Sequence, residues 1–181
     1  ELSESDLIRN YVLMGLEPSE QTYVYEHLWR PMEQLFIYET QGTVMDAFFR
    51  HYLTMKLSRI PKQGRVYEEF KLYHLNCEFG TIRELCQDLL DYAKYYTNIV
   101  FKRNSDTDLK KLYKDIIDLR MEVSYPFLLK IHRDCTEELI TLDELKEILK
   151  LCISYVLRRA ICEIPTNSMN KTFATLKNYI R

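Results

Sequence analysis

The sequence predicts an all-α fold, an irregular bundle of about eight or nine helices with no sheet. Glycine and proline are rare, at four and five in 181 residues, whereas a sheet protein needs many tight turns. Apolar residues recur at helical spacing in several segments, and helix-capping signals stand directly before those segments. Apolar residues at 46% and charged residues at 29% are typical of a folded globular chain.

The first part of the chain shows helix signals separated by clear breaks. Ser3 or Ser5 can cap a first helix through DLIRNYVLM, and Gly15 is placed to end it. Pro18 suits the first turn of a second helix, PSEQTYVYEHLW. Pro31 either kinks that helix or starts another, because a proline inside a helix removes one backbone hydrogen bond.

The middle of the chain contains two further helix patterns and a third that opens on a capping box. Gly42 and Thr43 are expected to break the chain before VMDAFFRHYLTMKLS, and IPKQG is expected to be a loop before a helix over about 66–75. Thr81 and Glu84 form a capping box, in which a hydroxyl and a carboxylate satisfy free amides at a helix start. Behind it an apolar stripe has helical spacing: Ile82, Leu85, Leu89, Ala93, Tyr96 and Val100.

The last part of the chain predicts four more helices. Ser105 is expected to cap the first, whose stripe is Leu109, Leu112, Ile116 and Leu119, and Pro126 begins the second. Thr141 and Glu144 form a second capping box, which opens LDELKEILKLCISYVLRRAIC.

Two expectations concern the end of that long helix. Within 148–157 only Lys150 and Ser154 are polar, so this stretch is expected to be buried on most sides. Pro165 is expected to end the helix. A last helix then holds Phe173, Leu176 and Ile180.

The chain is expected to form a single helical domain over 1–181, with room for two subdomains that meet near 58–66 or 102–106. No period of about 20–50 residues repeats, so a solenoid is not indicated. The first residue is Glu1 rather than Met, and a helical pattern starts within a few residues. We therefore expect this chain to be a piece of a longer, multidomain protein.

The cysteines and the hydropathy indicate a cytoplasmic location. The five cysteines form an odd set without a C-x-x-C pair, which is typical of reduced thiols. No apolar run approaches the roughly 18 residues of a membrane span, and no signal peptide opens the chain, so no membrane partner is expected. The cysteines are Cys77, Cys86, Cys135, Cys152 and Cys162.

The net charge of −2 hides a strong asymmetry along the chain. Residues 1–47 carry nine acidic residues against Arg9 and Arg30, whereas residues 150–181 carry six basic residues against Glu163. Binding of nucleic acid by the whole domain is therefore not indicated, although a local basic face remains open.

A basic and aromatic stretch at 48–67 is the candidate for such a face. Cations neutralise phosphates, and aromatic rings can stack on unpaired bases, so this composition suits single-stranded or flipped nucleotides. The alternative, which we favour, is that the aromatics face the core and the cations face water. The aromatic residues are Phe48, Phe49, Tyr52 and Tyr67, and the cations are Arg50, Lys56, Arg59, Lys62 and Arg65.

The sequence contains none of the common catalytic signatures, such as G-x-x-x-x-G-K, G-x-G-x-x-G, G-x-S-x-G or H-E-x-x-H. We therefore expect this chain not to be an enzyme and to hold no cofactor. A zinc site is a weaker alternative, because His74-x-x-Cys77 and His132-x-x-Cys135 could supply four ligands. The favoured interpretation is two coincidental pairs, with thiols packed as small apolar groups and imidazoles at the surface.

Three segments resemble GmrSD-type proteins, in which a ParB-like GmrS domain precedes an HNH nuclease domain, GmrD. The opening ELSESDLIRNYVLMGL is similar to the stretch that follows GmrS, and YVLRRAICEIPTNSMNKTFATL resembles the helix–loop–helix before the nuclease. WRPMEQLF, with Trp29 and Pro31, is similar to a third segment of the family. The matching residues are Leu2, Ser3, Asp6, Leu7, Ile8, Asn10 and Tyr11, and then Tyr155, Arg158, Arg159, Ile161, Pro165, Thr166, Asn170, Lys171 and Phe173.

The resemblance implies the helical connecting region of such a protein, without either active site. The family couples a nucleotide-using domain to an endonuclease that acts on modified or foreign DNA. The D-G-Q-Q-R-type loop of GmrS is absent here, and so is the H-x-x-P motif of the nuclease. No histidine of the chain has a proline three residues on: His27, His51, His74 and His132.

The predicted function is therefore a non-catalytic scaffold of a restriction or defence protein that positions the flanking GmrS-like and HNH nuclease domains. Arg158 and Arg159 are the best candidates for interdomain or DNA contact. Adjacent helix positions differ by about 100°, so one can face inward to a carboxylate while the other meets a partner. Arg9, Asn10, Asn170 and Lys171 are further candidate contact residues. Alternatives are a nucleic-acid-binding module that uses 48–67, or a protein–protein adaptor.

Overall fold

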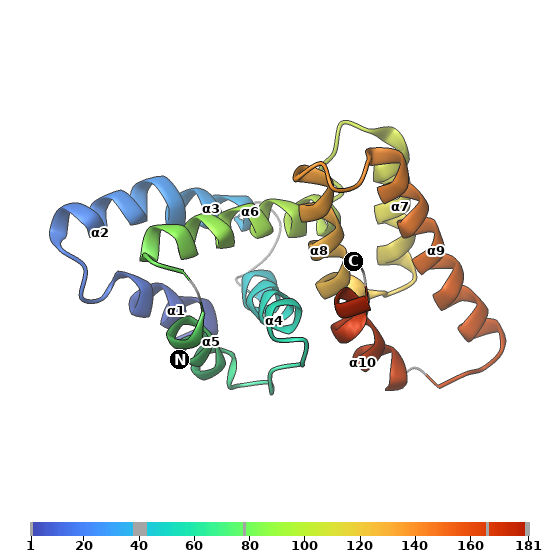
Figure 1. Ribbon diagram of the computed structural model, residues 1–181, viewed down its shortest axis with the longest axis horizontal. Coiled ribbons are helices and arrows are strands. Elements are labelled where there is room, and N and C mark those ends of the chain that lie inside the picture. Colours follow the sequence, from blue (N-terminus) through green and yellow to red (C-terminus); the bar gives the residue numbers. More distant parts are fainter. Residues whose placement is uncertain (1, 38–42, 78, 166, 180–181) are drawn as a thin grey trace. The chain divides into compact units, whose positions relative to one another are not determined.

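The computed structural model describes residues 2–37, 43–77, 79–165 and 167–179 (Figure 1). These residues form helices joined by short connections, and none of them lies in a strand. The predicted all-α fold is therefore confirmed. Four residues named in the sequence-based predictions, Glu1, Gly42, Thr166 and Ile180, lie outside the described residues.

The chain divides into two compact units. Unit 1 comprises Glu1–Leu53 and Pro61–Lys94, and unit 2 comprises Thr54–Ile60 and Tyr95–Arg181. Two of the divisions fall within long helices, because α4 (Thr43–Leu57) and α6 (Ile82–Val100) each begin in unit 1 and end in unit 2. The division after Ile60 falls within 58–66, whereas no division falls within 102–106.

Helix starts in unit 1 follow local sequence signals. Ser3, rather than Ser5, caps α1 (Glu4–Leu13) and forms a capping box with Asp6. Gly15 follows this helix with a φ of +81°, a left-handed conformation that glycine adopts without steric cost. At the start of α6, the Thr81 amide donates to Glu84 and the Glu84 amide donates to the Thr81 hydroxyl, as predicted.

Pro31 lies in the first turn of a new α-helix that follows a π-helical turn. The chain runs from α2 (Pro18–Val24) through η1 (Tyr25–Trp29) into α3 (Arg30–Phe36). Pro31 has no amide hydrogen to donate, and the start of an α-helix does not require that donor. The remaining helix of unit 1 is α5 (Val66–Asn76), which packs beside α1 (Figure 1).

The core of unit 1 is aromatic. Trp29 stacks on Phe49 with ring centroids 6.0 Å apart, and Phe49 meets Phe70 edge to face. All three side chains are fully buried. Tyr52 is also buried, and its hydroxyl donates to Asp88 across 2.6 Å. Burial raises the pKa of Tyr52 well above 10, so this hydroxyl stays protonated and remains a donor.

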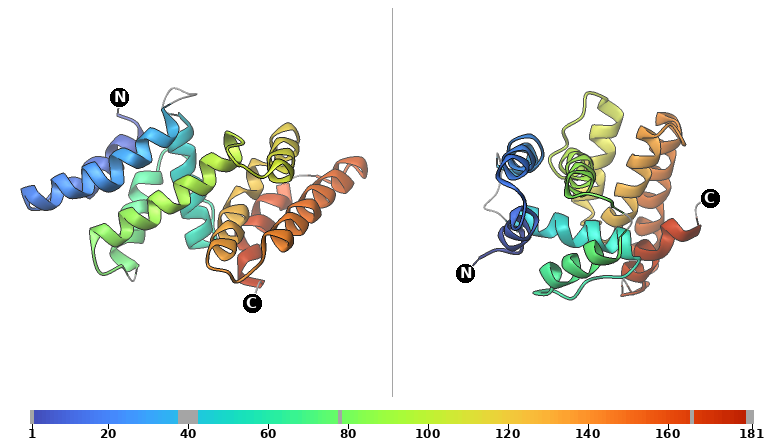
Figure 2. Two further views of the ribbon diagram at one scale, coloured as in Figure 1. Left: turned by 90° about the horizontal axis from the view of Figure 1, so that it is seen from above. Right: turned by 60° about the vertical axis from the view of Figure 1, so that its left-hand side comes forward.

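Unit 2 is built around α9, which lies against α7 and α8 (Figures 1 and 2). The residues that α9 contributes to the core of unit 2 are mainly aliphatic. They are Leu145, Leu149, Cys152 and Val156. The elements of unit 2 after α6 are α7 (Thr107–Asp118), η2 (Glu122–Ser124), α8 (Tyr125–Thr136), α9 (Leu142–Ile161), α10 (Asn167–Thr175) and η3 (Leu176–Tyr179).

Two predicted helix ends in unit 2 are wrong by one to a few residues. Asp106, not Ser105, caps α7, because its carboxylate accepts from the amides of Asp108 and Leu109. Helix α9 ends at Ile161 rather than at Pro165, because Glu163 adopts a φ of +53° and turns the chain before the proline. The Thr141–Glu144 capping box at the start of α9 is confirmed.

The prediction that 148–157 is buried on most sides is also wrong. Leu151 is 68% exposed and Leu157 is 40% exposed, and farther along α9 Ile161 is 79% exposed. The physical reason is that α9 buries only a narrow stripe against α7 and α8, so that side chains beside this stripe, such as Leu151 and Leu157, remain accessible to solvent.

Candidate functional site

The aromatic part of the 48–67 stretch belongs to the core. Phe48, Phe49 and Tyr52 are each 0% exposed, so their rings offer no face on which a base could stack. Tyr67 is half-buried, and the Lys71 ammonium lies 5.2 Å from its ring centroid. The favoured interpretation, in which these aromatics face inward, therefore holds for the three buried rings.

The cations of the same stretch are divided between the units and have different surroundings. In unit 1, Arg50 donates through Nε to the Pro61 carbonyl, and Arg65 forms an ion pair with Glu68 across 2.7 Å. Lys62 is exposed in unit 1. Lys56 and Arg59 belong to unit 2, where Lys56 is half-buried and Arg59 is exposed.

His132, one of the four possible zinc ligands, has both ring nitrogens engaged. Nδ1 lies 2.7 Å from the Leu128 carbonyl and Nε2 lies 2.6 Å from the Tyr113 hydroxyl. Burial lowers the pKa of His132 from 6.5 to about 4, so the ring is neutral near pH 7. Nδ1–H then donates to Leu128, Nε2 accepts from Tyr113, and no lone pair is left for a metal.

The other H-x-x-C pair is engaged in local hydrogen bonds. His74 Nδ1 lies 2.9 Å from the Tyr11 hydroxyl, and Cys77 Sγ lies 3.1 Å from the His74 carbonyl. Cys135 is half-buried, which raises the pKa of its thiol. Among the described residues, no group of three or more His, Cys, Asp or Glu side chains is placed to hold a metal ion.

A polar pocket of about 440 Å³ in unit 1 contains two carboxylates that cap helices. Glu4 accepts from the Tyr67 amide at the start of α5, and Asp46 accepts from the Ser5 amide at the start of α1. Each carboxylate thus satisfies an amide that has no partner within its own helix. This pocket connects α1, α4 and α5, and its carboxylates have structural partners.

Arg9 is held inside unit 1, whereas Asn10 is exposed. Arg9 forms ion pairs with Asp6 across 2.9 Å and with Glu33 across 3.1 Å. Glu33 also accepts from the indole N–H of Trp29. The predicted contact residue Arg9 therefore links α1 to α3 within the unit.

Arg159 links the end of α9 to the start of α10. Its Nη2 donates to the Pro165 carbonyl across 2.6 Å and to the Ser168 hydroxyl across 2.8 Å, and Nη1 donates to the Tyr155 hydroxyl. The predicted carboxylate partner is absent from these contacts, so that part of the prediction is wrong. All three acceptors are neutral, because the chain brings a loop carbonyl and two hydroxyls to the guanidinium.

Two other arginines near this end of unit 2 have exposed side chains. Arg158 precedes Arg159 on α9, and Arg120 follows α7 with a φ of +51°. Among the described residues, neither these two arginines nor Arg159 has a carboxylate partner. We call Arg120, Arg158 and Arg159 the arginine group. Arg120 was missed by the sequence analysis, because no local pattern indicates that the turn after α7 meets α9.

Arg120 and Arg159 line one pocket of about 340 Å³, which we call the arginine pocket. Its other lining residues are apolar and come from α9, α10, η2 and the turns after α7 and α9. The Nε–H of Arg159 is shielded from solvent and has no acceptor among the described residues, an arrangement that costs about 1–3 kcal/mol. The apolar lining residues are Leu119, Met121, Val123, Val156, Ala160, Ile164 and Met169.

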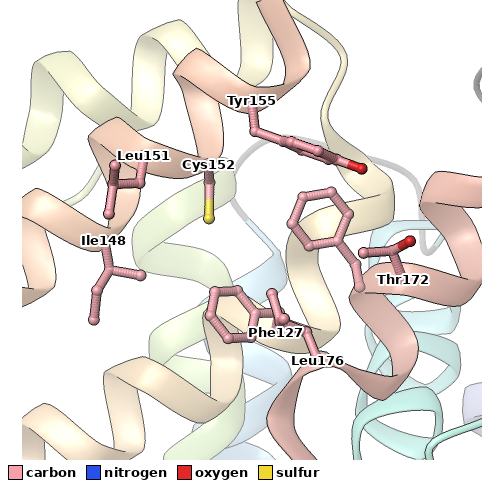
Figure 3. A pocket seen from close by; sticks show the side chains of 8 residues that line it. Phe127, Ile148, Leu151, Cys152, Tyr155, Thr172 and Leu176 are labelled. Carbon is pink, nitrogen blue, oxygen red and sulfur yellow. The ribbon is translucent and has the colours of Figure 1, made fainter. Parts of the chain in front are cut away.

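A second pocket of unit 2, of about 380 Å³, is almost wholly apolar (Figure 3). Ile148, Leu151, Cys152 and Tyr155 project into it from α9, opposite Phe127 of α8. Its remaining lining residues, Thr172, Phe173 and Leu176, come from α10 and η3. The predicted contact residues Asn170 and Lys171 lie on α10 and are exposed.

Among the described residues, no helix combines the length and the apolar character that a membrane crossing requires. No protein-family model, curated protein sequence or solved structure matches the chain.

Proposed function

We propose that this chain is a non-catalytic helical scaffold in a GmrSD-like DNA-targeting protein, where it positions a ParB-like domain and an HNH nuclease domain. In this proposal the end of α9 contacts a neighbouring domain. The single observation that carries it is the contrast between two adjacent arginines. Arg159 is used within unit 2, whereas Arg158 is exposed and has no carboxylate partner among the described residues.

The segment that resembles the helix–loop–helix before the nuclease supports this proposal. Some of its residues build unit 2: Phe173 is 2% exposed, and Arg159 connects α9 with α10. Others contribute little to that packing, because Arg158, Ile161 and Lys171 are exposed. Exposed residues of this kind are available to a partner.

The surroundings of Arg158 favour a protein partner over a bare phosphate backbone. Ile161, one helical turn from Arg158, is 79% exposed. An exposed apolar side chain next to an arginine without a counter-ion suits a protein interface, because arginine is enriched in interfaces and their buried centre is apolar. The partner surface is therefore expected to be acidic with an apolar centre.

The test uses the chain that the complete gene encodes, with the substitution Arg158→Glu. We expect DNA cleavage to fall roughly tenfold or more, because a reversed charge at an interface opposes docking. Lys110→Glu on α7 is the matched control, since Lys110 is also an exposed cation of unit 2. Cleavage by this control is expected to match the unsubstituted protein, and neither substitution is expected to change the thermal unfolding midpoint.

Two results would contradict the proposal. One is unchanged cleavage after Arg158→Glu in a protein that remains folded. The other is a complete gene product that has neither a ParB-like domain before this region nor an HNH nuclease domain after it.

A further inference from the structure

We infer that the arginine pocket binds a carboxylate carried by an aliphatic group. The pocket brings two cations to one apolar cavity of about 340 Å³, and neither cation has an acidic partner among the described residues. This inference goes beyond the proposed function and does not depend on it, because it concerns a ligand of unit 2 alone.

The walls of the arginine pocket indicate an aliphatic ligand. The lining side chains other than Arg120 and Arg159 are all aliphatic or thioether groups, without an aromatic ring. Met121 is 1% exposed and Met169 is 7% exposed, so both belong to the packed interior around the pocket. A ligand with a planar ring system would find no ring to stack on, whereas a branched or linear alkyl group matches these walls.

The guanidinium groups indicate an anion. Arg159 is fixed by three hydrogen bonds from Nη1 and Nη2, which leaves one Nη1 N–H among its five donors for a ligand, since Nε–H is shielded. Arg120 is exposed and has no carboxylate partner among the described residues. Two like charges at one pocket repel each other, and a bound anion removes that repulsion.

The pocket suits a carboxylate better than a phosphate. The exposed guanidinium of Arg120 can bind either anion through two parallel hydrogen bonds, but a carboxylate carries only a single charge. A phosphate monoester carries about two charges near pH 7, and the apolar walls would strip water from both. The volume is at the lower end of the range for small-molecule sites, about 300–1,000 Å³, which fits a medium-length fatty acid or the last residue of an aliphatic peptide.

Binding can be measured by NMR of the chain with ¹³C-labelled methionine methyl groups. Met121 and Met169 line the pocket, whereas Met32 and Met45 are buried in unit 1 and serve as internal controls. The probes are decanoate and decan-1-ol, and the peptide acetyl-Gly-Ile-Leu with either a free carboxylate or an amide end. We expect decanoate or the free-carboxylate peptide to shift only the Met121 and Met169 methyls, and the neutral analogues to bind at least roughly tenfold more weakly.

A matched pair of substitutions tests the role of Arg120. Arg120→Gln removes the charge at an exposed position, and we expect it to weaken carboxylate binding roughly tenfold. Lys102→Gln is the control, because Lys102 is also an exposed cation of unit 2 and has a φ of +52°, close to that of Arg120. The control is expected to bind the probe as the unsubstituted chain does.

The two carboxylate probes distinguish the source of the ligand. Tighter binding of decanoate indicates a fatty acid, and tighter binding of the peptide indicates the end of a polypeptide. The inference is overturned if neither carboxylate shifts the Met121 and Met169 methyls. It is equally overturned if the neutral analogues bind as tightly, or if Arg120→Gln leaves the affinity unchanged.

Discussion

Several arginines of unit 1 have carboxylate partners within the unit, whereas the arginine group at the end of α9 in unit 2 does not. In unit 1, Arg9, Arg65 and Arg83 each form an ion pair with a glutamate. In unit 2, Arg133 forms an ion pair with Glu137, whereas the arginine group of Arg120, Arg158 and Arg159 has no carboxylate partner among the described residues. A charge that is paired within its own unit stabilises that unit, whereas an unpaired charge remains available to a ligand or a partner.

Exposed apolar side chains alone do not separate the units. Unit 1 leaves Leu72 and Leu75 of α5 exposed, at 56% and 72%, and unit 2 leaves Leu151 and Ile161 of α9 exposed, at 68% and 79%. Single exposed apolar residues are common on protein surfaces. The combination of an exposed apolar residue with a neighbouring unpaired arginine is what directs attention to unit 2.

The largest expected effect comes from comparing the buried aromatic core of unit 1 with an exposed apolar side chain of α9. Phe49→Ala is expected to lower the free energy of unfolding by about 3–5 kcal/mol, because Phe49 is fully buried between Trp29 and Phe70. Leu151→Ala is expected to change it by less than about 0.5 kcal/mol, since Leu151 is 68% exposed. Urea unfolding of both variants provides the measurement. Equal losses of unfolding free energy in the two variants would mean that the Leu151 side chain is buried.

The second prediction concerns pH and the buried His132 of unit 2. Burial lowers the pKa of His132 from 6.5 to about 4, so between these values the unfolded chain binds a proton that the folded chain does not. The folded state is therefore most stable with respect to this group above about pH 6.5. The free energy of unfolding falls as the pH is lowered towards 4, and the loss is about 2 kcal/mol at pH 5. His51 of unit 1, whose pKa burial also lowers to about 4, adds a loss in the same direction.

The variant His132→Gln isolates the part of this pH dependence that belongs to unit 2. Its free energy of unfolding should fall by about 2 kcal/mol less between pH 7 and pH 5 than that of the unsubstituted chain. In the unsubstituted folded chain, the ¹⁵N shifts of the His132 ring should remain those of a neutral imidazole at pH 5. An imidazole that is protonated at pH 6 in the folded chain would disprove the assignment.

The third prediction compares the capping boxes of the two units. Thr141→Ala at the start of α9 and Ser3→Ala at the start of α1 are each expected to cost about 1 kcal/mol, because each hydroxyl accepts from a backbone amide. Thr136→Ala is a control, since the Thr136 hydroxyl donates to the His132 carbonyl near the end of α8 and caps no helix start. A loss as large in this control would argue against capping as the cause.

The smallest expected effect tests the difference in charge pairing directly. Arg158→Ala is expected to change the free energy of unfolding by less than about 0.5 kcal/mol, because Arg158 has no ion pair to lose. Arg9→Ala is expected to lower it by up to about 1 kcal/mol, since it removes the contacts with Asp6 and Glu33. High salt should reduce the loss of unfolding free energy caused by Arg9→Ala and should not alter the small change caused by Arg158→Ala. A larger loss at Arg158 would reveal a structural role for that side chain.

The sequence by itself determined the local features of this protein. The capping boxes at Thr81 and Thr141 and the prolines at positions 18 and 126 were all predictable, and the cap of α1 was narrowed to Ser3 or Ser5. Each depends on atoms within about one helical turn, so the information lies in neighbouring residues. The all-α class followed from the same local signals.

Only the tertiary structure decided which apolar surfaces are covered and which charges are paired. The 48–57 part of α4 carries cations and yet buries Phe48 and Phe49, whereas the more apolar 148–157 of α9 leaves Leu151 exposed. Burial of a helix face depends on elements distant in sequence that cover it, and on α9 these elements bury only the stripe of Leu145, Leu149, Cys152 and Val156. The meeting of Arg120 with Arg159 at one pocket has the same origin, since the turn after α7 and the end of α9 are brought together only by folding.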